Sequence, residues 1–480
     1  MLGNIGWIWS TVLTLELVFI VRAIIRPHRS PASRIAWVVV IGVIPFLGIF
    51  LYVLFGETNI GYRKKQRVLQ VQEKLRLFDV SDVEVAARLQ KVPEEYQMLF
   101  RTAGSISRFP VVAGNVGKLF SDSNETISSI IADIDAAKQH VHIVFYIWLA
   151  DNNGCRMVEA LIRASKRGVI CRVIVDEMGS RDLIRSRQWM KMKSAGVFAT
   201  TSMPIGNFLL KPLRGRIDLR NHRKIVVIDD WITYCGSQNC ADPEFRIKAK
   251  YAPWVDAVIR FEGPVAQQNQ HLFASDWMTH STQDLSDIIS QPLRESHGSI
   301  IAQAFGTGPT VRDAAMSEMF VSMMYAARQE IIITTPYYVP DESMQHAVRA
   351  AAHRGVNTTI IFPAKNDSRI VAAASESYYP ELLDAGVKVF EFTAGLLHTK
   401  SFTVDGCVTL IGSANHDRRS FDLNYENNIL CYDSKITGEV RDLQLMYLSK
   451  SDPVTEEMVA EWSLIDRLWR NSIAMLGPLL

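Results

Sequence analysis

The chain has 480 residues, which is enough for two or three domains with a sizeable core. Its 52 basic and 50 acidic side chains give a net charge of +2, so no global positive field indicates a nucleic-acid partner. The six cysteines form no C-x-x-C pair and have no histidine at ligand spacing. This pattern favours reduced, buried thiols over disulfides and argues against a zinc site, and we expect neither a metal nor a cofactor.

Two apolar runs, residues 5–21 and 35–55, stand near the N-terminus. A spanning helix needs about 20 apolar residues, which the second run supplies and the first nearly does. We predict that residues 1–60 anchor the protein to a membrane as a hydrophobic helical hairpin. Glu16 in the first run and Pro45 in the second also allow a tilted, interfacial or re-entrant hairpin. Basic residues flank both sides almost equally, and only the lack of disulfide signals favours a cytoplasmic catalytic part.

Residues 61–105 are rich in charged side chains and have helical periodicity, most clearly at 80–89. We interpret this stretch as a juxtamembrane connector. Its basic start either contacts anionic lipid headgroups or belongs to an ordinary solvated helix, and the sequence leaves both readings open.

Two short phrases, each with a glycine that closes a helix before a valine-rich strand, recur further along the chain. The pairs are residues 166–169 with 353–356, and residues 195–197 with 385–387. Strands that alternate with helices predict an α/β fold whose parallel or mixed sheet has helices on its faces. We therefore expect two similar halves, at residues 106–295 and 296–480.

The strongest signal is a motif, H-x-K-x4-D-x6-G-S-x-N, that occurs twice with identical spacing. The first copy consists of His222, Lys224, Asp229, Gly236, Ser237 and Asn239, and the second of His398, Lys400, Asp405, Gly412, Ser413 and Asn415. The apolar runs 225–228 and 401–404 predict strands, so the His and Lys of each copy share a face. Two such faces together would place two imidazoles, two ammonium groups and several neutral donors around a phosphodiester.

These paired motifs resemble those of the phospholipase D superfamily, and other phrases resemble the bacterial cardiolipin synthases within it. The phrases are VFYIW at 144–148, PWVD at 253–256, EGP at 262–264, TPYYVP at 335–340, KNDS at 365–368 and GLLHTK at 395–400. The resemblance implies two α/β/α halves related by a pseudo-two-fold axis, with the two motifs meeting at their interface. It also implies a bacterial inner-membrane enzyme, whose oligomeric state stays open, a homodimer included.

By this resemblance His222 is the nucleophile that attacks phosphorus and His398 is the general acid, although the reverse order remains possible. The groups expected to hold the phosphoryl oxygens or to support those that do are Lys224, Lys400, Asn239, Asn415, Ser237 and Ser413. The resemblance places a histidine-orienting carboxylate at Glu426, 28 residues after His398. In the first half that spacing falls on Lys250, so we assign the role to Asp256. Asp229 and Asp405 belong to the catalytic motifs and are expected to brace the fold.

The implied reaction transfers a phosphatidyl group from one phosphatidylglycerol to another, which gives cardiolipin and glycerol. The expected partners are phosphatidylglycerol and anionic membrane lipid, with no nucleic acid. A phospholipase D-type hydrolase or a phosphatidylserine synthase-like phosphatidyltransferase would use the same residues. Whether phosphatidylethanolamine can replace one substrate is left open.

Two further segments are candidates for lipid contact. The motif histidines are 398 − 222 = 176 residues apart, whereas the glycines of the second repeated phrase are 386 − 196 = 190 apart. The first half therefore has 14 extra residues before its motif, around residues 205–216. These residues, and the amphipathic C-terminus at 462–480, either contact a bilayer or pack as ordinary protein segments.

Overall fold

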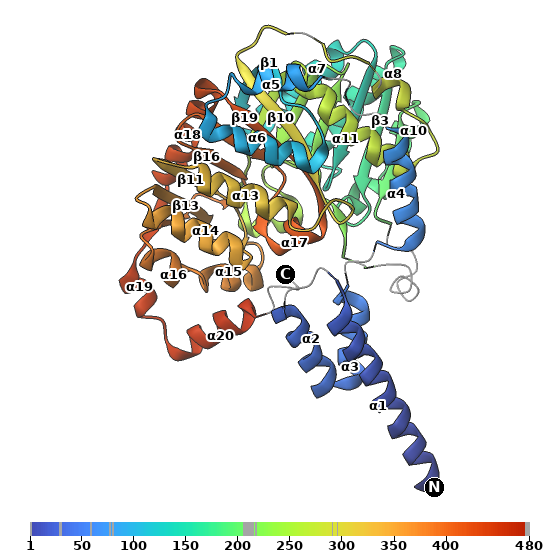
Figure 1. Cartoon of the computed structure of the whole chain (residues 1–480). Helices are drawn as coiled ribbons and strands as arrows, with labels where there is room; N and C mark the ends of the chain where they lie inside the picture. Colours follow the sequence, from blue (N-terminus) through green and yellow to red (C-terminus); the bar gives the residue numbers. More distant parts are fainter. Residues whose placement is uncertain are drawn as a thin grey trace. The chain divides into compact units, whose positions relative to one another are not determined.

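The structure is a computed structural model, and it describes residues 2–27, 31–57, 60–75, 78, 81–204, 216, 218–289, 291–294 and 296–475. The chain forms two compact units (Figure 1). The N-terminal unit comprises residues 1–65 and 205–219, and the main unit comprises residues 66–204 and 220–478. The predicted insertion at 205–216 lies outside the described residues, apart from Arg216.

The N-terminal unit contains three helices, α1 (Leu2–Ile25), α2 (Pro31–Val43) and α3 (Pro45–Phe55). The second apolar run is divided between α2 and α3, because Pro45 lacks the amide that would continue α2 and its fixed φ suits the first turn of α3. The predicted hairpin of two helices thus has three. Over the described part of the chain, none of the helices combines the length and apolar character needed to cross a bilayer.

Side chains from all three helices meet in a small apolar core around Ala23, Trp37, Ile41 and Tyr52. An ion pair connects α1 to the residues after α3, with Arg22 Nε 2.6 Å from Glu57 Oε1. Many other apolar side chains of this unit are exposed, among them Ile25, Val43, Phe46 and Phe50.

The main unit is built on one mixed sheet, which has 16 strands within the described ranges, including the two-residue β5 (Arg220–Asn221) beside β19. The strands of the first half are β1 (Val112–Phe120), β2 (His140–Phe145), β3 (Ile170–Asp176), β4 (Phe198–Ser202), β6 (Ile225–Ile228), β7 (Ile232–Gly236) and β9 (Val258–Glu262). Those of the second half are β10 (Ile300–Thr307), β11 (Glu330–Thr334), β13 (Asn357–Pro363), β14 (Lys388–Phe392), β16 (Ser401–Val404), β17 (Val408–Gly412), β19 (Asn424–Tyr432) and β20 (Ser451–Val454). The strands predicted at 225–228 and 401–404 are confirmed as β6 and β16.

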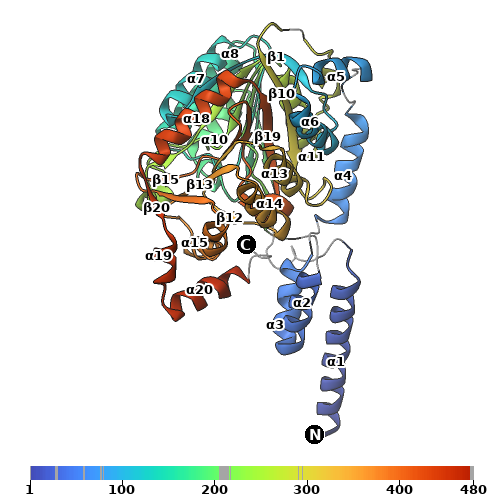
Figure 2. The ribbon, with the colours of Figure 1, turned by 60° about the vertical axis from the view of Figure 1, so that its left-hand side comes forward.

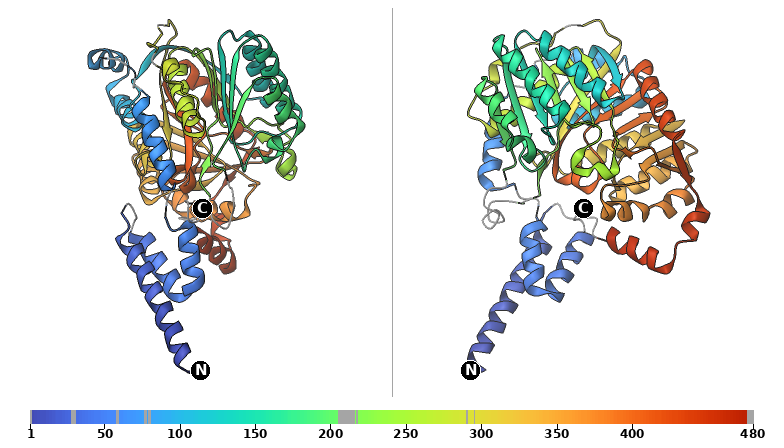
Figure 3. Two further views of the ribbon diagram at one scale, coloured as in Figure 1. Left: turned by 90° about the vertical axis from the view of Figure 1, so that its right-hand side faces the viewer. Right: turned by 180° about the vertical axis from the view of Figure 1, so that it is seen from behind.

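The strand order is repeated in the two halves. It runs β1-β9-β7-β6-β2-β3-β4 in the first half and β10-β19-β17-β16-β11-β13-β14 in the second, which adds β20 at the edge. Antiparallel pairing of β1 with β10 joins the halves. They lie side by side in the view from behind, the first in teal and green and the second in orange and red (Figure 3). The two similar α/β halves predicted from the repeated phrases are therefore present.

Helices cover both faces of each half (Figure 2). Those of the main unit are α4 (Tyr62–Lys74, which begins in the N-terminal unit), α5 (Asp82–Leu89), α6 (Glu94–Ser107), α7 (Ser123–Ala136), α8 (Asn152–Lys166), α9 (Arg181–Ile184), α10 (Arg187–Ser194), α11 (Val265–His280), α12 (Ser286–Ile289), α13 (Ala315–Ala326), α14 (Glu342–His353), α15 (Arg369–Glu376), α16 (Tyr379–Asp384), α17 (Arg418–Asp422), α18 (Ser434–Leu448), α19 (Glu456–Ala460) and α20 (Leu464–Ala474), with a short 3-10 helix, η1 (Arg246–Tyr251).

Alternation along the strands explains these layers. In β2, Val141 and Ile143 pack with the α7–α8 pair, whereas Val144 packs with α11. In β11, Ile331 and Ile333 pack with α13 and α14, whereas Ile332 packs with α18. Each half is therefore an α/β/α sandwich.

Most of the segment interpreted as a connector, from Gln66 on, belongs to the main unit. Helix α6 buries Leu99 and Phe100 in the core of the second half. In α4, the Arg67 guanidinium donates hydrogen bonds to the main-chain oxygens of Met278 and Ser281. This arginine of the basic segment therefore binds the protein's own backbone.

Helix α20 is held at one face and exposed at the other. Ile473 is buried and Arg470 Nε lies 2.6 Å from Glu376 Oε2 on α15, whereas Leu464 and Ile465 are 82% and 79% exposed. The amphipathic pattern predicted for the C-terminus thus docks one face and leaves apolar side chains in solvent. Residues 476–480 lie outside the described part of the chain.

Candidate active site

Three short strands and the start of β19 bring the two motifs together at the interface of the halves. Strand β5 (Arg220–Asn221), just before His222, pairs with the start of β19 in the second half. Strand β15 (Leu396–Leu397), just before His398, pairs in the same parallel way with β8 (Trp254–Val255) in the first half. The backbone amide of each histidine continues this pairing, from His222 to Tyr425 O at 2.9 Å and from His398 to Val255 O at 2.8 Å.

As a result of this pairing, each motif histidine meets a carboxylate of the other half. His222 Nδ1 lies 2.9 Å from Glu426 Oε2, and His398 Nδ1 lies 2.6 Å from Asp256 Oδ1. A count of 28 residues from His398 locates Glu426 but does not say which histidine the carboxylate meets. The structure places it with the other histidine, because β5 and β8 pair with strands of the opposite half.

The different spacing of the two acids also has a structural cause. Asp256 follows His222 by 256 − 222 = 34 residues, whereas Glu426 follows His398 by 426 − 398 = 28. The six-residue 3-10 helix η1 lies inside the longer interval. It explains why a 28-residue count falls on Lys250, which belongs to η1.

The serines of the G-S-x-N segments hold the acids. Ser237 Oγ donates to Asp256 Oδ1 at 2.6 Å, and Ser413 Oγ donates to Glu426 Oε2. Each serine and its acid belong to the same half, so each half supplies a fixed carboxylate to the histidine of the other. Neither half contains a complete dyad by itself.

Burial sets the protonation of both dyads. It lowers the pKa of His222 and of His398 to about 4, against the opposing effect of the adjacent carboxylates. Burial also opposes ionisation of Asp256 and Glu426, but their histidine partners and the nearby lysines lower the pKa of each carboxyl below its usual value. At neutral pH each imidazole is thus neutral and donates Nδ1–H to a carboxylate, which leaves the Nε2 lone pair for chemistry.

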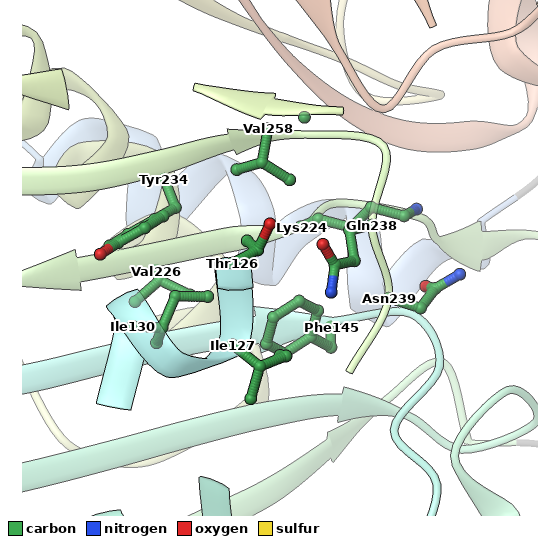
Figure 4. A pocket seen from close by; sticks show the side chains of 11 residues that line it. Thr126, Ile127, Ile130, Phe145, Lys224, Val226, Tyr234, Gln238, Asn239 and Val258 are labelled. Atoms are coloured by element: carbon green, nitrogen blue, oxygen red, sulfur yellow. The ribbon is translucent and has the colours of Figure 1, made fainter. Parts of the chain in front are cut away.

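The motif lysines are buried next to the histidines. Lys224 Nζ donates to His222 O at 2.9 Å and Lys400 Nζ donates to His398 O at 2.6 Å. Burial lowers the pKa of Lys224 to about 8 and that of Lys400 to about 7. Lys224 also lines a small, mainly apolar cavity of about 20 Å³ together with Phe145 (Figure 4).

The motif aspartates lie behind the site and brace it. Asp229 accepts hydrogen bonds from the backbone amides of residues 138–140, at 2.8–2.9 Å, and Asp405 accepts from residues 328–330 in the same way. Both aspartates have a positive φ, 53° and 49°, in the turn that follows β6 or β16. Asp405 also accepts from Tyr96 Oη at 2.8 Å. Each aspartate thus caps the backbone amides at the start of the strand beside its motif.

A single cleft of about 320 Å³ lies over the dyads. Both histidines line it, as do Asn239 and Asn415 from the G-S-x-N segments. Asn239 Oδ1 accepts from the Ile147 amide at 3.3 Å, so its amide NH₂ is the end left for a ligand. The buried serines and lysines do not line this cleft and act from behind it.

Comparison with known sequences identifies the family of this chain. The cardiolipin synthase, phospholipase D-like domain family matches residues 130–277 and 320–444, and a phospholipase D-nuclease N-terminal family matches residues 17–57. Cardiolipin synthase A of Yersinia pseudotuberculosis serotype O:3 (strain YPIII) is 32% identical over 492 aligned residues, which cover 99% of each chain. Cardiolipin synthase A of Yersinia pestis has the same identity and coverage.

The chain belongs to the cardiolipin synthase family of phospholipase D-like proteins. The fold is also shared with the crystal structure of a phosphatidylserine synthase from Haemophilus influenzae Rd KW20, at a TM-score of 0.59 and 15% identity. That match covers 81% of this chain and all of the other. The likeness concerns the fold alone.

Several residues that line the cleft were not among the site residues predicted from the sequence. Tyr146 and Trp254 place their rings 4.9 Å and 4.6 Å from those of His222 and His398. Further polar residues that line the cleft are Arg220, Lys248, Tyr337, Asp367, Asp417, Arg419 and Asn424. The family phrases contained Tyr146, Trp254, Tyr337 and Asp367. Arg220 and Asn424 stand two residues before a motif histidine and a dyad acid, so aligning the two halves at those positions would have found them.

Proposed function

We propose that this protein is a cardiolipin synthase that transfers a phosphatidyl group from one phosphatidylglycerol to the headgroup hydroxyl of another, which yields cardiolipin and glycerol. One observation carries the proposal: two crossed histidine–carboxylate dyads open into a single cleft, in a chain of the cardiolipin synthase family. One imidazole is available to attack phosphorus and the other to move a proton.

In the first half-reaction, Nε2 of one histidine forms a bond to phosphorus while the bond from phosphorus to the headgroup glycerol breaks. The bound phosphodiester anion favours a protonated imidazole, so the second histidine takes up a proton from solvent on Nε2 as the substrate binds. It gives this proton to the departing oxygen, and glycerol leaves. The product is a phosphatidyl group bound to histidine. The carboxylate on Nδ1 keeps the attacking ring in the reactive tautomer and stabilises its positive charge.

Negative charge on the phosphoryl oxygens is offset by Lys224, Lys400 and the amides of Asn239 and Asn415. These groups occupy a buried site, where an ammonium acts more strongly on a developing charge than it does in water. A bound phosphodiester anion also favours the protonated lysines, whose pKa values burial has lowered to about 8 and about 7.

In the second half-reaction, the histidine that gave up its proton takes one from the incoming hydroxyl of a second phosphatidylglycerol. The new oxygen–phosphorus bond forms, the histidine–phosphorus bond breaks, and cardiolipin is released. One phosphodiester is exchanged for another, so the balance requires no nucleotide. Hydrolysis would share the first half-reaction and use water in the second.

We also propose that the N-terminal unit attaches the enzyme to the membrane that contains its substrate. The exposed apolar side chains of α1, α2 and α3, and the match of residues 17–57 to an N-terminal family of phospholipase D proteins, support this attachment. Its test is partition: a chain that begins at Gln66 and retains the main unit should leave the membrane fraction.

The proposed reaction is tested with purified, detergent-solubilised protein and phosphatidylglycerol as the only lipid. Products are identified and quantified by mass spectrometry. Cardiolipin with an equimolar amount of glycerol supports the transferase. Phosphatidic acid with glycerol, in the absence of cardiolipin, would mean a hydrolase and would overturn the proposal.

A further inference from the structure

The cleft has two ends that are equivalent by the pseudo-symmetry of the fold but differ in chemistry. Arg220 of β5 is paired in register with Asn424 of β19 at the His222 end. Leu396 of β15 is paired with Trp254 of β8 at the His398 end. The same two positions thus hold a cation and an amide at one end, and an alkyl chain and an indole at the other.

Asn424 presents an unpaired acceptor to the His222 end. Its Nδ2 donates to Glu426 Oε1 at 3.3 Å, and an ionised carboxylate can only accept, so the orientation of the amide is fixed. The opposite atom, Oδ1, is buried and has no hydrogen-bond partner among the described residues, and the side chain lines the cleft. A buried carbonyl of this kind requires a donor, and a ligand hydroxyl would supply one.

Two arginines lie at the same end. Arg220 and Arg419 both line the cleft. Burial raises the pKa of the Tyr146 hydroxyl, and the charges of the two arginines partly offset this effect. The Tyr146 ring packs against His222. Arg419 belongs to α17, whose Ser420 donates to the dyad acid Glu426.

Acidic neighbours face both of these arginines. Asp176 faces Arg220 and Asp417 faces Arg419, and burial raises the pKa of each of these carboxyls to about 6. The guanidinium groups therefore lie among buried carboxylates, and an anion that reaches the cleft meets two cations there.

The His398 end offers a different surface. Trp254 packs between Phe245, at 3.8 Å between ring centroids, and His398, at 4.6 Å. The cation that lines this end, Lys248, pairs with Asp367, a carboxylate that also accepts from Tyr337 Oη at 2.6 Å. The His398 end therefore presents a paired lysine beside stacked aromatic rings.

We propose that the His222 end is the headgroup subsite, where Asn424 Oδ1 accepts from a glycerol hydroxyl and Arg220 and Arg419 bind the phosphate of the acceptor lipid. This inference rests on the proposed transferase function. The leaving glycerol carries no second phosphate, whereas the incoming phosphatidylglycerol does. The arginines therefore act in the second half-reaction, and Asn424 acts in both.

This placement divides the chemistry between the histidines. The headgroup oxygen leaves opposite the attacking atom, so His398 Nε2 bonds to phosphorus and His222 gives its proton to the departing glycerol oxygen. His222 then takes the proton of the acceptor hydroxyl as the new ester bond forms and the bond from His398 to phosphorus breaks. The order expected from the superfamily, with His222 as nucleophile, is thereby reversed.

The test compares Arg419→Gln with Arg418→Gln, a neighbouring arginine of α17 that does not line the cleft. Each variant and the parent protein receive phosphatidylglycerol alone, and the ratio of cardiolipin to phosphatidic acid is measured by mass spectrometry. We expect the ratio to fall at least tenfold in Arg419→Gln, because water replaces a poorly held acceptor, and to stay at the parent value in Arg418→Gln.

An unchanged ratio in Arg419→Gln would overturn the subsite, as would an equal fall in both variants. Thermal unfolding of each variant identifies a loss caused by misfolding, and Arg220→Gln then provides the second reading of the ratio. If the parent protein makes no cardiolipin, the proposed function itself has failed. If the parent protein makes cardiolipin and the ratio is unchanged in both Arg419→Gln and Arg220→Gln, only the subsite is wrong.

Discussion

Replacement of Glu426 by glutamine tests the crossed dyads most sharply. The carboxylate is fully buried and accepts from four donors, on His222, Ser413, Ser420 and Asn424. Glutamine has nearly the same shape, but its NH₂ group must face one of these donors. A serine hydroxyl can turn to accept, so the amide oxygen stays available to His222 Nδ1 while the negative charge is lost.

The expected cost follows from that lost charge. A histidine that moves a proton in the transition state becomes positive, and the carboxylate stabilises it only when ionised. Neutralising the acid of such a pair lowers kcat by about 10³- to 10⁴-fold, or about 4 to 5.5 kcal/mol at 1.36 kcal/mol per factor of ten. We expect a loss of this size in Glu426→Gln, with little change in KM.

The assay measures cardiolipin formation by Glu426→Gln, by its counterpart Asp256→Asn and by the control Glu391→Gln. Glu391 is a half-buried carboxylate that accepts from Tyr379 Oη at 3.0 Å and does not line the cleft. Histidine side-chain ¹⁵N spectra provide the second readout, because Glu426→Gln should shift the signals of His222 and spare those of His398. Activity near that of the parent, or a shift at His398 alone, would refute the crossed arrangement.

Three other outcomes are expected. His222→Ala and His398→Ala should each abolish turnover yet retain the thermal unfolding profile of the parent, and measurable cardiolipin synthesis by either one would sink the two-histidine mechanism. Asp405→Ala should lower the free energy of unfolding by about 2 to 4 kcal/mol in urea titrations, because three backbone amides lose their acceptor; an unchanged midpoint would show that the turn does not depend on this bracing. Activity as kcat/KM should decline as the pH rises above about 7, since Lys400 and then Lys224, with pKa values of about 7 and about 8, lose the charge that holds the phosphodiester; a flat profile to pH 10 would contradict that role.

Local sequence signals predicted much of the fold. The apolar runs before Asp229 and Asp405 do form β6 and β16, and the glycines at 168, 196, 355 and 386 do follow helices in a left-handed conformation, with φ between 84° and 92°. These features depend on residues close together in the chain. The repeat therefore revealed both halves without any knowledge of their contacts.

The partners of the histidines could not be predicted in this way. Which carboxylate reaches His222 depends on the pairing of β5 with β19, about 200 residues away, and a count along the chain contains no information on that pairing. Pro45 indicated an irregular second apolar run, but the sequence alone did not show that this run divides at Ile44 into two separate helices. The two ends of the cleft differ in chemistry, which becomes visible only when the strands are paired. One end then has Arg220 beside Asn424, and the other has Leu396 beside Trp254.

The central claim is a phosphatidyl group carried on a histidine of a composite site. It is tested most directly by mixing the protein with phosphatidylglycerol labelled with ³²P, quenching within one turnover and mapping the labelled peptide. The account predicts a label that is lost in acid and stable in base, as a phosphorus–nitrogen bond is, and located on His398. A label on His222 would contradict the division of roles between the histidines, and turnover with no protein-bound label would contradict the covalent mechanism.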